Sequence, residues 1–385
     1  MSSHVWSKGW LLVLAVLPAV LAGALFPWDG GARSAATAME SILYVDAGAS
    51  DPEPDGLSWT TAFTELQTAL AVAVPGDQIW VAAGVYKPDF DPVSGAYTGY
   101  MTATFALTNG VKLYGGFSGE MSTLVERLPD VYLTVLSGDL EGDDQTDERG
   151  LITDTAYISG TNSYHVVTAS RVDNTAVLDG FVVTGGNAVG SPPDNVGGGM
   201  LNHAANPVIA NMLFIGNRAR FGGGGMVNRN TSTPTLRNVI FDGNRAEGGG
   251  GLFNRDGSNP RLVGVVFHNN RASYYGGGVK NNQSHPTLIN VVLSGNVANI
   301  NGGGMENFDS SPHLVNVTFN GNAADGDGGG LYNDSSTPTI HNSILWGNLD
   351  RSGSEMPGAQ IGNADSVPVI TYTLIQGSGG SGAAW

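Results

Sequence analysis

The middle of the chain repeats one residue pattern at a nearly constant interval, and this interval limits the possible folds more than any other feature. Successive prolines of the pattern are separated by 27 residues once and by 26 residues four times, at Pro207, Pro234, Pro260, Pro286, Pro312 and Pro338. A fixed period of this length is typical of a solenoid, in which each copy forms one structural unit and packs on its neighbours.

The pattern inside each copy favours strands over helices. Apolar residues alternate with polar ones, as in Leu236, Val239 and Phe241, and glycine and asparagine recur too often for a helix to fit between them. Three short strands and three turns suit a coil of about 26 residues, whereas the L-x-x-L-x-L frame of a leucine-rich repeat is missing. We therefore predict an all-β fold, a right-handed parallel β-helix with about 26 residues in each coil.

Stacking the coils about 4.8 Å apart places equivalent residues above one another, so that the alignment predicts columns of side chains. One apolar column consists of Phe214, Phe241, Phe267, Leu293, Phe319 and Leu345, and a narrower one of Ala219, Ala246, Ala272, Ala298 and Ala324. A single coil cannot bury such residues, but a stack of coils buries all except those at its ends. These columns are the predicted core.

Asparagine forms three further columns. Two are complete, namely Asn202, Asn228, Asn254, Asn281, Asn307 and Asn333, and then Asn217, Asn244, Asn270, Asn296, Asn322 and Asn348. The third has Gly264 in place of one asparagine and otherwise contains Asn211, Asn238, Asn290, Asn316 and Asn342. A side-chain amide donates and accepts, so stacked asparagines can form hydrogen bonds along the column, and asparagine tolerates the left-handed backbone of a tight corner. We interpret these residues as structural.

The copies resemble the repeats of polymorphic outer-membrane proteins, which contain G-G-x-hydrophobic and F-x-x-N elements; Phe241 and Asn244 belong to one such match. Segments 76–84, 109–117 and 177–181 resemble secreted bacterial right-handed parallel β-helix repeat proteins of the pectate-lyase-like superfamily. The resemblance covers roughly residues 42 to 376 and implies a β-helix at the cell surface. It does not imply one activity, because this fold carries lyases, hydrolases and adhesins.

The first 38 residues have the features of an export signal. Lys8 precedes an apolar run over residues 10–26, and residues 36–38 form a small-x-small cleavage site. An uncleaved membrane anchor is the alternative, but Pro18 and Gly23 interrupt the run, which is shorter than a usual membrane span. We predict a cleaved signal peptide and a secreted or cell-surface protein with no transmembrane segment in the mature chain. Cysteine is absent, so stability must come from the stacked core.

We divide the rest of the chain into an N-terminal cap with irregular first coils (39–150), regular coils (151–348), and a last coil with a flexible tail (349–385). A helix is predicted over residues 61–73, with Phe63, Leu66 and Leu70 on one face and Thr60 or Thr61 as the N-cap. This helix should cover the exposed strand edges of the first coil. At the other end we expect one strand over residues 369–375 and no capping element.

An acidic stretch over residues 138–148 is the candidate metal site. Carboxylate oxygens on a flexible loop can bind calcium, and the candidate ligands are Asp139, Asp143, Asp144 and Asp147. The stretch lacks EF-hand spacing, so a solvated acidic loop without a metal is the alternative. Ca²⁺ is the one cofactor that the sequence suggests.

Motifs for catalysis are sparse. Of the N-x-D, D-D, G-H-G and R-x-K elements of polygalacturonases, D-D is present at Asp143-Asp144, G-H-G and R-x-K are absent, and the histidines occupy unrelated repeat positions. Arg218, Arg245 and Arg271 form a column that we interpret as a solvated charged edge. The sequence thus identifies neither catalytic nor binding residues.

Charge excludes one class of partner. The net charge of −17 argues against nucleic acid, whose phosphates require lysine and arginine. The flanks of a β-helix suit extended ligands, so we expect a non-catalytic adhesion or binding scaffold for a polysaccharide or a surface partner. The alternative is a polysaccharide lyase or glycoside hydrolase that acts on an acidic polysaccharide.

Overall fold

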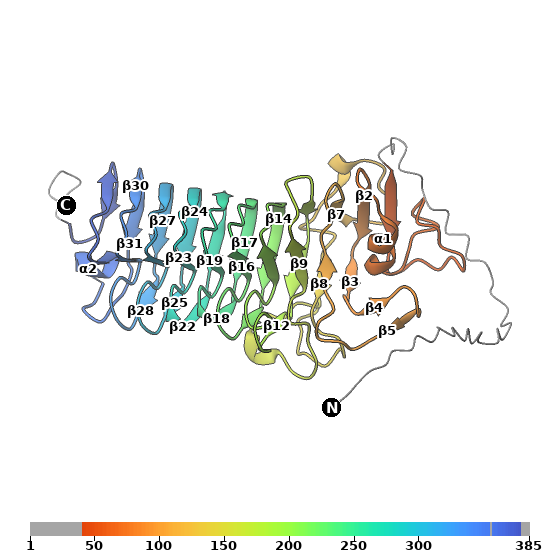
Figure 1. Ribbon diagram of the computed structural model, residues 1–385, viewed down its shortest axis with the longest axis horizontal. Coiled ribbons are helices and arrows are strands. Elements are labelled where there is room, and N and C mark those ends of the chain that lie inside the picture. Colours follow the sequence, from red (N-terminus) through yellow and green to blue (C-terminus); the bar gives the residue numbers. More distant parts are fainter. Residues whose placement is uncertain (1–40, 355, 379–385) are drawn as a thin grey trace, which may run out of the picture. The chain divides into compact units, whose positions relative to one another are not determined.

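The computed structural model describes residues 41–354 and 356–378 (Figure 1). All described residues belong to one compact unit. The predicted signal peptide lies outside the described residues. In the described part of the chain, no helix is long and apolar enough to cross a membrane.

The repeats form coils of a parallel β-helix, as predicted, and each regular coil contributes strands to three faces. The long face comprises β1 (Ile42–Val45), β2 (Gln78–Ala82), β3 (Gly84–Tyr86), β7 (Lys112–Phe117), β8 (Thr134–Ser137), β10 (Val177–Asp179), β11 (Val182–Thr184), β14 (Val208–Ile215), β17 (Thr235–Asp242), β20 (Arg261–Val263), β21 (Val266–His268), β24 (Thr287–Ser294), β27 (His313–Asn320), β30 (Thr339–His341), β31 (Ile344–Trp346), β33 (Val369–Thr371) and β34 (Leu374–Ile375). The chain then turns onto a short face of β12 (Asn187–Ala188), β15 (Arg218–Ala219), β18 (Arg245–Gly248), β22 (Arg271–Tyr275), β25 (Val297–Ala298) and β28 (Ala323–Ala324).

A glycine-rich turn leads from the short face to the back face. The back face comprises β6 (Phe105–Ala106), β9 (Val167–Ser170), β13 (Met200–His203), β16 (Met226–Arg229), β19 (Leu252–Arg255), β23 (Val279–Asn282), β26 (Met305–Phe308), β29 (Leu331–Asp334) and β32 (Ile361–Ala364). All three faces are parallel sheets whose neighbouring strands come from successive coils. Figure 1 shows the regular coils following one another in sequence order from β14 to β31.

The predicted core columns are confirmed by the strand register. Leu236 pairs with Ile209 of the preceding coil and with Leu262 of the following one. The Phe241 ring stacks between those of Phe214 and Phe267, with centroid distances of 5.0 and 4.9 Å. These side chains are fully buried, and their burial supplies the main stabilisation that a chain without disulfides requires.

The two complete asparagine columns are also confirmed, and both are buried. Along the back face each Nδ2 donates to the Oδ1 of the next asparagine, for example from Asn202 to Asn228 at 2.7 Å. In the second column the amides also bind the backbone, since Asn244 Nδ2 donates to the carbonyl of Phe214 at 2.9 Å. The third column is exposed and left-handed, with φ between 50° and 55° at all five asparagines and 66° at Gly264.

The predicted N-terminal helix exists but is shorter than expected. Helix α1 spans Leu66–Val72 and buries Leu66 and Ala69, while the N-cap is Glu65 and not a threonine. Phe63 remains extended because its backbone N–H donates to the carbonyl of Tyr44 and its own carbonyl accepts from Asp46. Within the irregular first coils, the chain forms an antiparallel hairpin of β4 (Phe90–Asp91) and β5 (Ala96–Tyr97).

The C-terminal end is more regular than predicted. The expected single strand over 369–375 is interrupted at Tyr372, which adopts the left-handed φ of 51° seen in the third asparagine column. The short helix α2 (Pro357–Gln360), which the sequence did not predict, precedes β32 and buries Gln360. Gln360 Oε1 accepts from Asn348 Nδ2 at 2.8 Å, so it continues the asparagine ladder after the last repeat.

Candidate functional site

Three exposed arginines form a row on the short face. Arg218 of β15 pairs with Arg245 of β18, which pairs with Arg271 of β22. Among the described residues, no carboxylate lies within 4.0 Å of their guanidinium groups. Like charges directly opposite each other on neighbouring strands are destabilising, so folding alone does not favour this unpaired row. We call these three residues the arginine row.

A groove runs beside the arginine row. Its far wall is the segment around the 3₁₀ helix η2 (Thr155–Tyr157), which Asp154 caps by accepting a hydrogen bond from the Ala156 backbone. One cavity of 510 Å³ is lined by Arg245, Arg271 and the wall, and a second of 370 Å³ by Arg218, Arg245 and the same wall. Both cavities share Thr155, Ala156 and Ser273, so they form one polar groove along the row.

The wall is held against the coils through the turns that precede the arginines. A side chain at Gly216 would collide with the backbone carbonyl of Ile152, and a Cβ at Gly243 would approach the Thr153 carbonyl to 3.1 Å. These turns have φ of 64° and 62°, which glycine adopts without steric cost. The sequence analysis found the column of arginines but missed the groove, because the wall comes from a segment outside the repeats.

The structure brings together three of the four predicted calcium ligands. Carboxylate oxygens of Asp139, Asp143 and Asp144 lie within 4.8 Å of one another. Asp139 is buried and accepts from the backbone N–H groups of Gly142, Asp143 and Asp144. Burial raises the pKa of Asp144, although its oxygens accept from Ser159 N and Asn162 Nδ2. Asp147 stands apart from this trio and pairs with Arg149 at 2.7 Å.

Calcium binding at the trio of Asp139, Asp143 and Asp144 remains a prediction, and titration calorimetry tests it. If the trio binds calcium, saturable heat should appear at or below about 1 mM metal, and Asp144→Asn should remove most of it. Asp147→Asn is the matched control, because that carboxylate lies outside the trio and should not affect the binding. Absence of heat at millimolar calcium would contradict calcium binding. The loop would then have only the structural role that its backbone hydrogen bonds define.

A buried ion pair on the back face was not expected from the sequence. In one outward column Leu201, Val227 and Phe253 are followed by Lys280 and Glu306. Lys280 Nζ lies 3.4 Å from Glu306 Oε2 and 4.4 Å from the centre of the Tyr275 ring. Burial raises the pKa of Glu306 to about 7, against the opposing effect of Lys280. The sequence could have revealed this ion pair, because the residues of one column change there from apolar to charged.

Comparison with known protein families gives a match over a short segment of the regular coils. The family model of the Chlamydia polymorphic membrane protein repeat matches residues 316–334, which extend from β27 to β29. No curated protein matches the chain. The crystal structure of pectate lyase Pel9A aligns with 90% of this chain and 82% of that chain, at 11% sequence identity and a TM-score of 0.39. The chain is a parallel β-helix protein, and one segment of it is similar to the Chlamydia polymorphic membrane protein repeat.

Proposed function

We propose that this protein acts at the cell surface or in secreted form and binds an acidic polysaccharide along the arginine row without cleaving it. The supporting observation is the row itself, three exposed guanidinium groups in direct register with no carboxylate partner among the described residues. In a chain with a net charge of −17, such a row is a local exception to the acidic surface. A ligand with regularly spaced negative charges would relieve the repulsion between the arginines.

The chemistry of the groove suits carboxylates on a chain of sugars. A guanidinium binds a carboxylate through two parallel hydrogen bonds, and arginine is less strongly hydrated than lysine. The row repeats with the strand spacing of about 4.8 Å, which is comparable with the length of one sugar unit in an extended chain. Thr155, Ser273 and Asn299 line the groove and offer hydroxyl and amide groups to sugar hydroxyls. The matching Chlamydia repeat supports the cell-surface location.

Binding of polygalacturonate to single-site variants tests this function. Arg245 occupies the centre of the row and lines both cavities, so Arg245→Ser should weaken binding at least tenfold, or by about 1.4 kcal/mol. Binding should also weaken with added salt, because it depends on charge. Arg237→Ser is the matched control, since Arg237 is an exposed arginine on the long face of the same coil and should have no effect.

The same samples distinguish binding from catalysis. Incubation with polyuronates, with and without calcium, should release neither unsaturated products nor new reducing ends. If the unmodified protein cleaves a polyuronate and Arg245→Ser abolishes the cleavage, the protein is a polysaccharide lyase or hydrolase and the proposed function is wrong. Equal binding by the Arg245 and Arg237 variants would show that the arginine row is not the binding site.

A further inference from the structure

The exposed asparagine column on the long face lacks one member, and the gap opens into a groove. Asn211, Asn238, Asn290, Asn316 and Asn342 occupy equivalent left-handed positions, and Gly264 with a φ of 66° takes the sixth. The strand is also broken there, into β20 and β21, whereas β17 and β24 on either side run unbroken through this position. The column therefore has a gap of one amide between Asn238 and Asn290.

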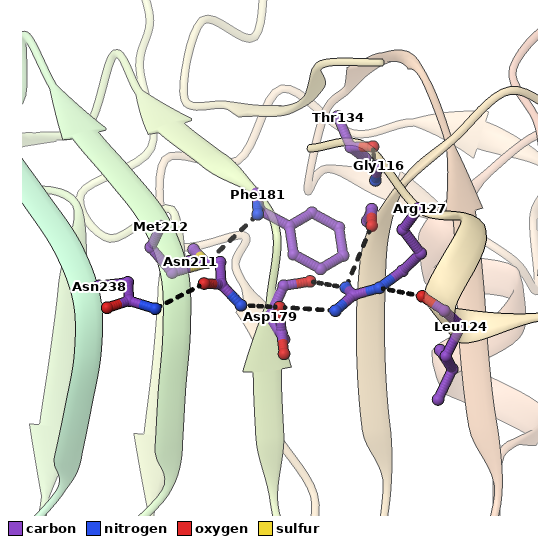
Figure 2. Close-up of polar contacts among 10 residues, drawn as sticks. Gly116, Leu124, Arg127, Thr134, Asp179, Phe181, Asn211, Met212 and Asn238 are labelled. Atoms are coloured by element: carbon purple, nitrogen blue, oxygen red, sulfur yellow. Dashed lines mark hydrogen bonds and ion pairs between the residues drawn. The ribbon is translucent and has the colours of Figure 1, made fainter. Parts of the chain in front are cut away.

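Figure 2 shows that the amides on the N-terminal side of the gap have a defined orientation. Arg127 donates to the backbone carbonyl of Asp179 at 3.2 Å and to its Oδ1 at 3.1 Å. The same Oδ1 accepts from Asn211 Nδ2 at 2.9 Å, and Asn211 Oδ1 accepts from Asn238 Nδ2 at 3.2 Å. A charged carboxylate at the start of the series requires each Nδ2 to face Asp179. Asn238 Oδ1 consequently faces away from Asn211, towards the gap.

The amides on the C-terminal side of the gap have the same orientation. Asn342 Nδ2 donates to Asn316 Oδ1 at 2.6 Å, and Asn316 Nδ2 donates to Asn290 Oδ1 at 2.9 Å. In this orientation Asn290 Nδ2 faces the side of the column where Gly264 lies. A Cβ placed on Gly264 would lie 3.0 Å from Asn238 Oδ1, so that oxygen lies directly beside the gap. Within the described residues, Asn238 Oδ1 and Asn290 Nδ2 have no hydrogen-bond partner, and one is an acceptor while the other is a donor.

An apolar groove adjoins the gap. Its cavity of 660 Å³ is lined by Asn238 and Gly264 and by aliphatic side chains of the long face, namely Leu213, Ile240 and Val266. The opposite wall comes from the segment around the 3₁₀ helix η1 (Leu124–Glu126), which contributes Leu124, Pro129 and Leu133. Ile240 is 43% exposed, so the groove floor presents apolar surface to a ligand.

We propose that the gap at Gly264 is a binding site for the acetamido group of an N-acetylated amino sugar. The N–H of the acetamido group would donate to Asn238 Oδ1, and its carbonyl would accept from Asn290 Nδ2. Its methyl group would rest on Ile240 and Val266. The ligand thus supplies the amide that the protein lacks at this position, and the proposal is independent of the arginine row.

The geometry of a secondary amide favours this ligand. In a trans amide the N–H and C=O groups point in opposite directions, so one amide can bridge an acceptor and a donor that face each other. The distance from Asn238 to Asn290 is two strand spacings, about 9.6 Å, and this span accommodates one amide with a hydrogen bond of about 2.9 Å on each side. A sugar hydroxyl in place of the acetamido group is too short to reach both partners.

Two methyl glycosides that differ in a single group provide the test. Methyl N-acetyl-β-glucosaminide and methyl β-glucoside differ only in having an acetamido group or a hydroxyl at one carbon. Titration followed by NMR should show at least tenfold tighter binding of the N-acetylated sugar, with saturation transfer to its acetyl methyl group. Gly264→Asn restores the amide at a backbone angle that five asparagines of the column already adopt, and it should weaken binding at least tenfold.

Two further variants complete the design. Asn290→Gly removes the donor, keeps the gap open and suits the left-handed φ of 55° at this position, so it should also weaken binding at least tenfold even if Gly264→Asn folds poorly. Asn342→Gly is the matched control, because it changes the same column away from the gap and should bind like the unmodified protein. The proposal would be overturned by equal binding of both glycosides or by unchanged binding in Gly264→Asn and Asn290→Gly. It would also be overturned if the unmodified protein showed no binding at about 50 mM sugar.

Discussion

Replacing Asn244 with alanine is expected to lower the free energy of unfolding by roughly 3–6 kcal/mol, because several buried polar groups lose their partners at about 1–3 kcal/mol each. Asn244 Oδ1 accepts from the backbone N–H and the Nδ2 of Asn217, both at 3.1 Å. Its own Nδ2 donates to the Phe214 carbonyl at 2.9 Å and to Asn270 Oδ1 at 3.0 Å. Alanine makes none of these bonds, and the polar groups that lose them are buried with Asn244.

Denaturant unfolding followed by circular dichroism measures this loss, and the same coil offers a matched control. Asn238→Gly also removes an asparagine from a column, but this side chain is exposed and the next coil already has Gly264 at the equivalent position. The control should change the stability by no more than about 0.5 kcal/mol. A similar small effect for Asn244→Ala would mean that the buried ladder does not stabilise the stack.

Raising the pH from about 4.5 to about 7 should make the folded protein less stable through Glu306. Burial raises the pKa of this carboxyl from its ordinary value of 4.5 to about 7. Between these values the unfolded chain loses the Glu306 proton while the folded chain retains it, so stability is highest below 4.5 and falls as the pH rises. At 1.36 kcal/mol for each pH unit, the contribution amounts to roughly 3 kcal/mol.

Comparison of the pH dependence in two variants isolates this contribution. Glu306→Gln should remove the fall, since glutamine has a similar shape and does not titrate in this range. Glu247→Gln is the control, because Glu247 is half-buried on the short face and should retain the fall. The measured quantity is the difference in slope, so an overall change in stability from the unpaired Lys280 does not affect it. Identical slopes for Glu306→Gln and the unmodified protein would contradict the prediction.

Local sequence was a poor guide where a long-range contact determines the conformation. Residues 61–64 have the spacing of a helix, but the backbone of Phe63 forms hydrogen bonds with Tyr44 and Asp46, which keeps it extended. The helix can therefore begin only at Leu66. At the other end, Gln360 takes the place of an asparagine after an irregular segment, and no fixed period could reveal that equivalence.

The candidate sites show the same division. The column of arginines was visible in the sequence, but the groove depends on the segment around Thr155, which lies outside the repeats. Likewise the substitution of Gly264 for asparagine was apparent, whereas the orientation of the neighbouring amides depends on Arg127 and Asp179 from earlier coils. The orientation of an amide group depends on its hydrogen-bond partners, and the repeat pattern does not reveal these partners.

The sequence by itself determined that this chain winds into a parallel β-helix and which residues stack on one another. It could do so because a fixed period obliges equivalent residues of successive coils to meet, so that one alignment predicts every column. Only the tertiary structure decided which columns border a cavity, which charges stay unpaired, and where Glu306 is buried beside Lys280. The grooves depend on irregular segments that fold back over the coils. The unpaired and buried charges depend on how side chains of successive coils pack against one another.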